Sequence, residues 1–179
     1  MSCITTYTGK HIDPSAPDMA QVDIRDIAHA LSMTCRGNGH VKTFFSVGQH
    51  CIWCCREAEA RGYAPRLVLA CLLHDACEAY MSDVPRPFKH VLPAYIQAEE
   101  QFLDLVYEKY LGTVPDAAEK RLIRDIDDDL LWYDLKHLLN DPPEKPAPAV
   151  CVPPDYTVVP FFQTEQSYLA LFDRWSAQL

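Results

Sequence analysis

Apolar residues recur every three to four positions along most of the chain, which is the periodicity of amphipathic helices. In the segment 23–36 they fall on one helical face, formed by Ile24, Ile27, Ala28 and Leu31. Asp23 stands just before this run and is the expected N-cap. Because no strong alternating pattern of strands competes with the helical one, the sequence predicts an all-α fold.

Glycine and proline residues predict where the next helices begin and end. The segment 44–62 predicts a second helix that ends at Gly62. Pro65 suits the first turn of a third helix, which is expected to carry His74 and Asp75. The pattern therefore places two polar residues inside an otherwise apolar helix, where they are costly to bury.

The second half of the chain alternates between helical and proline-rich segments. The segment 86–95 is expected to be a loop, because Pro85, Pro87 and Pro93 prevent a continuous helix. Helices are predicted over 94–112, ending at Gly112, and from a cap-like Thr113 and Asp116 pair to about Asn140. A proline-rich surface segment over 141–160 and a last amphipathic helix over 162–178 follow, so residues 1–179 are expected to form one domain with its core at about 20–139.

Composition narrows the class of protein. With 179 residues and 49% hydrophobic residues, the chain is long and apolar enough to bury a core. A net charge of −9 argues against binding a nucleic-acid polymer, which requires a basic face. No run of eighteen apolar residues and no apolar signal region occur, so we expect no membrane association and a cytoplasmic location.

The chain has eight cysteines, which in that location are expected to be reduced and mostly buried thiols. The run "HCIWCC" contains His50, Cys51, Cys54 and Cys55. A structural zinc site needs four closed ligands, usually from a second paired cluster, and Cys71 and Cys77 lack the usual short spacing. We therefore do not expect structural zinc on these cysteines.

Four polar residues stand where the apolar pattern favours hydrophobic ones: His50, His74, Asp75 and Asp127. They come from three predicted helices, and side chains on facing helices commonly form metal sites in helical bundles. Taken singly, each has an ordinary explanation as a core histidine, a chance pair or part of a charged face. Together they predict a site for one divalent metal ion, which this mixed N/O set leaves open among Zn, Mn, Co, Fe and Mg.

Glu78 follows His74 by four residues and Asp75 by three, so we expect it on the same helical face one turn further along. A carboxylate in that position is suited to orient or deprotonate an attacking water without itself binding the metal. The sequence thus combines a metal site with a candidate general base.

The context of these residues resembles the HD-domain phosphohydrolases, whose spaced H…HD…D pattern corresponds here to His50, His74 with Asp75, and Asp127. The resemblance covers roughly residues 20–139. It is strongest to the branch that holds bacterial 5′-deoxynucleotidases and the phage dATP triphosphohydrolase. The segments that carry it are "DIRDIAHALSMTCRGNGH", "FFSVGQHC", "LLHDACEAYMSDVPRPFK" and "IDDDLLWYD".

The resemblance implies a compact HD-domain helical bundle that binds one divalent metal through these four residues. Asp127 is chosen over its acidic neighbours because the family pattern places leucines three and four residues later and an acid seven later. Here these positions hold Leu130, Leu131 and Asp134. The acid at the last position is usually Glu in the family, so Asp134 is a small departure.

The resemblance also implies roles for residues around the metal. Glu78 would position or activate the attacking water, and Asp83 would lie near the sugar or the leaving oxygen. Arg36 and Lys89 are expected at the phosphate, where a cation stabilises the charged ester. The residue after Arg36 is usually aromatic in this branch, and Gly37 replaces it here, which leaves base and sugar selectivity open.

The chain lacks residues that two other classes of HD enzyme require, the dinuclear enzymes and the alarmone hydrolases. Between Asp75 and Asp127 only His90 is a histidine, so the chain lacks the extra ligands of dinuclear HD enzymes. Ala79 occupies the position of an aspartate that alarmone hydrolases carry. The expected function is hydrolysis of small nucleotide substrates, by a dNTP triphosphohydrolase (dATP being one candidate substrate) or a 5′-deoxynucleotidase.

The alternative is a non-catalytic HD-fold protein that senses nucleotides or binds other proteins. Relatives in this branch form dimers or hexamers, so a homo-oligomer is expected. Apolar residues of the last helix would either form the interface or cover the core of their own chain: Tyr168, Leu171, Phe172 and Trp175.

Overall fold

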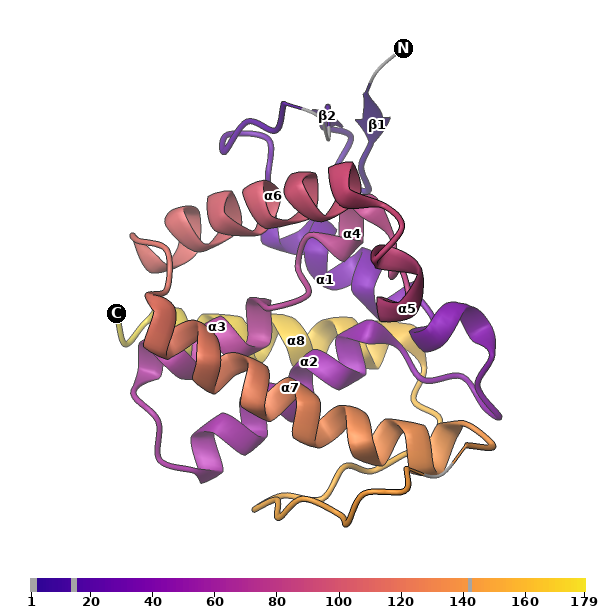
Figure 1. The fold of residues 1–179 in the computed structure, drawn as a ribbon. Helices are drawn as coiled ribbons and strands as arrows, with labels where there is room; N and C mark the ends of the chain where they lie inside the picture. Colours follow the sequence, from indigo (N-terminus) through magenta and orange to yellow (C-terminus); the bar gives the residue numbers. More distant parts are fainter. Residues whose placement is uncertain (1–2, 14–15, 142) are drawn as a thin grey trace.

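The computed structural model describes residues 3–13, 16–141 and 143–179, and helices make up most of this part of the chain (Figure 1). The long helices pack into one all-α body, as the sequence predicts. Their bounds are α1 Ile24–Met33, α2 Val47–Ala60, α3 Pro65–Leu73, α6 Pro93–Leu111, α7 Ala117–Leu138 and α8 Phe161–Ser176. The short elements are β1 Ile4–Thr5, β2 His11–Ile12, the 3-10 helix η1 Arg36–Gly39, α4 Glu78–Met81 and α5 Arg86–Lys89.

Local side-chain chemistry explains where several helices begin and end. Asp23 caps α1 by accepting a hydrogen bond from the Arg25 amide, as expected. Helix α6 ends at Gly112, whose φ of 79° lies in the left-handed region that glycine tolerates. Asp116 caps α7 and forms a capping box with Glu119, so Asp116 and not Thr113 is the cap of this helix.

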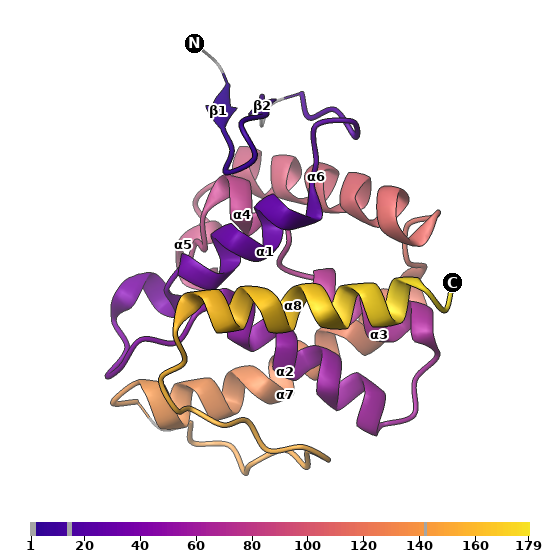
Figure 2. The same ribbon diagram turned by 180° about the vertical axis from the view of Figure 1, so that it is seen from behind.

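The core forms around α2 and α3, which lie between α7 on one side and α8 on the other (Figures 1 and 2). Most of their apolar residues are almost fully buried, among them Cys51, Ile52, Val68, Leu69 and Leu72. Helix α8 covers the outer face of this pair, and its Tyr168 hydroxyl donates to the Leu72 carbonyl. Tyr168, Phe172 and Trp175 are therefore buried within their own chain, which supports the core-covering interpretation of this helix.

The proline-rich segment follows the surface of the body, as expected for the described part of 141–160. The buried carboxylate of Glu57 accepts hydrogen bonds from the amides of Cys151 and Val152. Further along, the Tyr156 hydroxyl donates to Asp134. These contacts fasten an extended segment to α2 and α7 at two points.

Two of the helix bounds expected from the sequence need correction. Helix α2 begins at Val47 and not at Phe44, because Ser46 and Gln49 form a capping box there. Helix α3 ends at Leu73, and the next turns use i→i+3 hydrogen bonds such as Ala76 to Leu73. His74 and Asp75 therefore follow the helix and do not lie inside it.

The segment 86–95 contains a helical turn and not only a loop. Helix α5 spans Arg86–Lys89 with Pro87 in its first turn, where a missing amide hydrogen costs little. Residues 4–12 also form a small antiparallel hairpin of β1 and β2, which the helical pattern did not predict. Among the described residues, no helix is both long and apolar enough to span a membrane.

Candidate metal centre

The four predicted metal ligands meet in one place, although they come from three segments of the chain. His50 lies in α2, His74 and Asp75 follow α3, and Asp127 lies in α7. Nε2 of His50 is 3.0 Å from Oδ1 of Asp127. Nε2 of His74 is 3.2 Å from Oδ2 of Asp75 and 3.8 Å from Oδ1 of Asp127. Separations of this size suit ligands that share one divalent ion with bonds of about 2.0–2.2 Å.

Both histidines are held so that Nε2 faces the cluster. Nδ1 of His74 donates to the carbonyl oxygen of Cys71 over 2.8 Å. Nδ1 of His50 lies 3.0 Å from Oδ2 of Asp134, a buried carboxylate. An outer hydrogen bond of this kind sets the tautomer and leaves the Nε2 lone pair for a metal.

Several buried polar atoms at the centre lack a hydrogen-bond partner. They are Nε2 of His74, Oδ2 of Asp75 and Oε2 of Glu78. Leaving such atoms unsatisfied costs about 1–3 kcal/mol each. His74 and Asp75 approach each other without forming a hydrogen bond, as two ligands of one cation would. The donor set of imidazole and carboxylate groups therefore fits a divalent ion.

The pKa values at the centre reflect crowded negative charge. Burial would lower the pKa of His74, but the Asp75 carboxylate raises it well above its ordinary value. Burial would raise the pKa of Asp127, but the hydrogen bond with His50 and the attraction of both imidazoles hold it well below its ordinary value. Positive charge is thus favoured at this point, whether it is carried by an imidazolium or by a metal ion.

Glu78 lies beside the centre at the start of α4 and is buried. Burial raises its pKa well above the ordinary value, and the nearby carboxylates of Asp75 and Asp83 raise it further. A cation beside Glu78 would lower this pKa again, which favours the carboxylate form that a general base requires. Glu78 was expected on the same helical face as His74 and Asp75. It instead lies beside them because the turn that follows α3 leads into α4 at this residue.

The predicted phosphate-binding cations also lie at the centre, and each is already paired with acids. Arg36 donates to Oδ2 of Asp134 over 3.1 Å and lies 3.6 Å from Oδ2 of Asp75. Nζ of Lys89 lies 2.6 Å from Glu99 and 3.7 Å from Glu78.

Asp83 accepts a hydrogen bond from the amide of Gly37, which has a left-handed φ of 57°. Asp83 therefore ties the loop before α5 to η1, the turn that presents Arg36.

A cavity of about 600 Å³ opens beside these residues, which is large enough for a small-molecule ligand. Its charged wall includes Arg36, Lys89, Glu78, Asp75 and Asp127. Its apolar wall is formed by leucines in and just after the second half of α7 and by valines of other loops: Val41, Val84, Leu131, Leu135, Leu138 and Leu139. One side of the cavity thus suits charged groups, and the other suits an apolar or aromatic body.

Three further residues lie at the centre and were not predicted as part of the site: Asp134, Cys54 and Arg86. Asp134 lies seven residues after Asp127, a spacing that returns to the same helical face. Cys54 lies four residues after His50 and forms, with His50 and His74, a group that is suited to hold a metal. Cys51, His74 and Asp75 form a second group of this kind.

Arg86 bridges the carboxylates of Asp127 and Asp128 from α5. No sequence spacing signals this contact, because it depends on how α5 packs against α7.

No protein-family model matches the chain. The uncharacterized protein YfdR of Escherichia coli (strain K12) is 38% identical over 110 residues, which are 62% of this chain and 59% of that protein. An uncharacterized protein of Rhodobacter capsulatus is 32% identical over 127 residues, which are 67% of this chain and 64% of that protein. The chain thus spans about three-fifths of the length of these curated relatives, and neither name states an activity.

Proposed function

We propose that the protein is an HD-type, metal-dependent phosphohydrolase of deoxynucleotides, either a dNTP triphosphohydrolase or a 5′-deoxynucleotidase. The observation that carries the proposal is the convergence of His50, His74, Asp75 and Asp127 within 3.0–3.8 Å contacts, with buried donor atoms left unpaired. The order of these residues along the chain is the one that the HD resemblance requires.

These four residues would hold one divalent ion. When bound, the ion supplies Lewis acidity to a phosphate oxygen and lowers the pKa of a water molecule. Asp134 and the Cys71 carbonyl fix the two imidazole rings from behind, so little reorganisation is needed when the cation binds.

Glu78 would orient the attacking water and take its proton. Its Oε2 atom is buried and without a hydrogen-bond partner, so it is available for that role. The water oxygen forms a bond to phosphorus as the bond to the leaving oxygen breaks in line with it. Lys89, 3.7 Å from Glu78, would stabilise the charge that develops on the phosphate oxygens.

The cavity supports a nucleotide as the substrate class. Arg36 and Lys89 lie in the same wall as the metal cluster and suit a phosphate group. The leucines of α7 suit the apolar faces of a base and sugar. Gly37, whose position holds an aromatic side chain in the resembling branch, leaves room at η1.

The direct test incubates the purified protein with each dNTP and dNMP, with added manganese, cobalt or zinc, and separates the products by chromatography. Inorganic phosphate from a monophosphate indicates a nucleotidase, and tripolyphosphate from a triphosphate indicates a triphosphohydrolase. Glu78→Gln should abolish product formation, whereas the exposed Glu100→Gln should not. Nucleotide binding without turnover by the wild type would contradict the proposal and favour a sensing role.

A further inference from the structure

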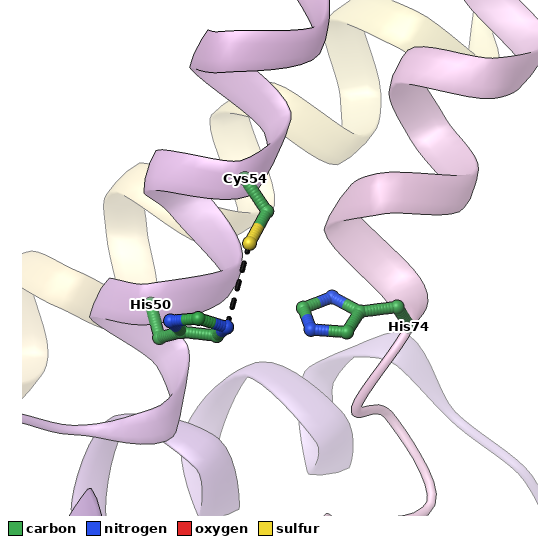
Figure 3. A group of neighbouring side chains, drawn as sticks. All are labelled: His50, Cys54 and His74. Carbon is green, nitrogen blue, oxygen red and sulfur yellow. Dashed lines mark hydrogen bonds between the residues drawn. The ribbon is translucent and has the colours of Figure 1, made fainter. Parts of the chain in front are cut away.

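Cys54 places a thiol at the metal centre, a ligand type that the HD pattern does not contain. Its Sγ atom lies 3.4 Å from Nε2 of His50, one helical turn earlier on α2. Figure 3 shows these two side chains on one helix and the His74 ring facing them from the end of the next. The three donor atoms lie within 4.8 Å of one another, and all three residues are buried.

His74 gives independent support for a cation at this point. Its side chain is more than nine-tenths buried, and its Nε2 atom has no hydrogen-bond partner. Because Nδ1 already donates to the Cys71 carbonyl, the Nε2 lone pair is left free, and the ring lies opposite His50 and Cys54 (Figure 3). A cation in this space would satisfy a group that is otherwise buried without a partner.

The spacing of sulfur and nitrogen suits direct coordination. Zinc binds thiolate sulfur at about 2.3 Å and imidazole nitrogen at about 2.0–2.1 Å, so two such ligands of a tetrahedral ion lie about 3.5 Å apart. The 3.4 Å between Cys54 and His50 is close to this separation. Nε2 of His50 also contacts Asp127, so the thiol and the carboxylates share the same histidine.

We propose that Cys54 supplies a thiolate ligand to the ion held by His50 and His74, so that the centre selects thiophilic Zn²⁺ or Co²⁺ over Mn²⁺ or Mg²⁺. The thiol proton leaves to solvent as the sulfur binds. The inference rests on the proposed metal centre and specifies its metal, because thiolate ligands favour zinc-like ions and all-oxygen sets favour magnesium and manganese.

The chain offers a matched control in Cys55, the next residue of α2. Cys55 is fully buried, like its neighbour, but among the described residues it belongs to neither of the two groups that are suited to hold a metal. Cys51 belongs to the second of these groups, together with His74 and Asp75, so it is a competing source of sulfur. Single Cys→Ser variants at 51, 54 and 55 separate these thiols with the smallest change in volume.

The experiment titrates the chelator-treated protein of 179 residues with Co²⁺ and follows thiolate-to-cobalt charge-transfer absorption in the near ultraviolet. The wild type, Cys51→Ser and Cys55→Ser should show the band, and Cys54→Ser should lose it while keeping the wild-type circular dichroism spectrum. In competition with a chelator, Cys54→Ser should lower zinc affinity at least about tenfold and leave manganese affinity unchanged.

A charge-transfer band that persists in Cys54→Ser, or cobalt binding by the wild type without any band, would overturn the inference. The band does not depend on turnover, so the two proposals fail separately. A band without nucleotide hydrolysis contradicts the phosphohydrolase and supports the thiolate ligand. Nucleotide hydrolysis by the cobalt-loaded protein without a charge-transfer band supports the phosphohydrolase and contradicts the thiolate ligand.

Discussion

Oδ2 of Asp134 lies 3.0 Å from Nδ1 of His50, on the side of the imidazole ring that faces away from the metal cluster. The same carboxylate accepts hydrogen bonds from Arg36 and Tyr156. Asp134 therefore favours one tautomer of His50 and links this histidine to Arg36 and to the proline-rich segment. It acts through His50, as a positioning residue.

Asp134→Asn should weaken metal binding about 10- to 100-fold, because the amide no longer provides a charged acceptor for the His50 ring. Isothermal titration with zinc or cobalt measures this loss. The control is Asp125→Asn, an exposed residue of the same helix, which should bind metal like the wild type. Equal affinities for Asp134→Asn and the wild type would show that the outer hydrogen bond does not organise the site.

Lys89 should matter for catalysis and not for metal binding. Its ammonium group is held by Glu99 and lies near Glu78, so it is anchored beside the proposed water position. Lys89→Met should lower kcat/KM for nucleotide hydrolysis about 10²- to 10³-fold, the usual cost of losing one donor to a developing charge. Lys120→Met removes a solvent-exposed ion pair with Asp104 and should have no such effect. A reduced metal affinity in Lys89→Met would argue for a structural role instead.

Glu57 should be a main anchor of the proline-rich segment. Its buried carboxylate binds two amides of that segment and Arg61. Glu57→Gln should lower the free energy of unfolding by about 1–3 kcal/mol, which chemical denaturation measures. Glu59→Gln breaks only an exposed pair with Arg174 and should cost less than about 1 kcal/mol.

The effect of Glu57 should also depend on pH. Burial alone would raise the Glu57 pKa, but the hydrogen bonds from Cys151, Arg61 and Val152 lower it below the ordinary value. A lowered pKa in the folded state contributes stability above the unfolded pKa of about 4.3 and loses it as pH falls further. The stability difference between the wild type and Glu57→Gln should therefore be constant near neutral pH and shrink below about pH 4. A difference that grows on acidification would contradict this assignment.

Gly48 allows α1 and α2 to approach closely. A Cβ atom at this position would lie 3.1 Å from the carbonyl carbon of Leu31 and 3.2 Å from the amide nitrogen of Ser32, both backbone atoms of α1. Helix propensity alone predicts that Gly48→Ala raises the free energy of unfolding by about 1 kcal/mol. Because displacing the backbone of a buried helix is energetically costly, we expect the free energy of unfolding to fall by about 1–2 kcal/mol instead. Thermal unfolding distinguishes these two outcomes. A Tm above that of the wild type would show that α1 and α2 can move apart without loss of stability.

The sequence predicted the features that depend on local chemistry. Asp23 and Gly112 bound their helices as expected, because capping and left-handed backbone are properties of a few neighbouring residues. The apolar periodicity likewise predicted the all-α fold. The periodicity did not predict the end of α3. Nothing in the local pattern shows that the helix stops at Leu73 and continues as tighter turns with i→i+3 hydrogen bonds.

Contacts between distant segments were predictable only where a long-range motif exists. The HD resemblance named His50 and Asp127, which are 77 residues apart and in contact. Cys54 was visible in "HCIWCC" but was discounted, because a structural zinc site needs a second cysteine cluster. Its position near His74 depends on the packing of α2 against α3, which no spacing within one helix reveals.

The most direct measurement is an anomalous difference map from crystals soaked with cobalt, recorded at the cobalt absorption edge. The account predicts one peak, bonded to Nε2 of His50, Nε2 of His74, oxygens of Asp75 and Asp127, and Sγ of Cys54. No peak among these residues in the wild type, or one that persists unchanged in Asp75→Ala, would contradict the proposed centre and the phosphohydrolase that depends on it.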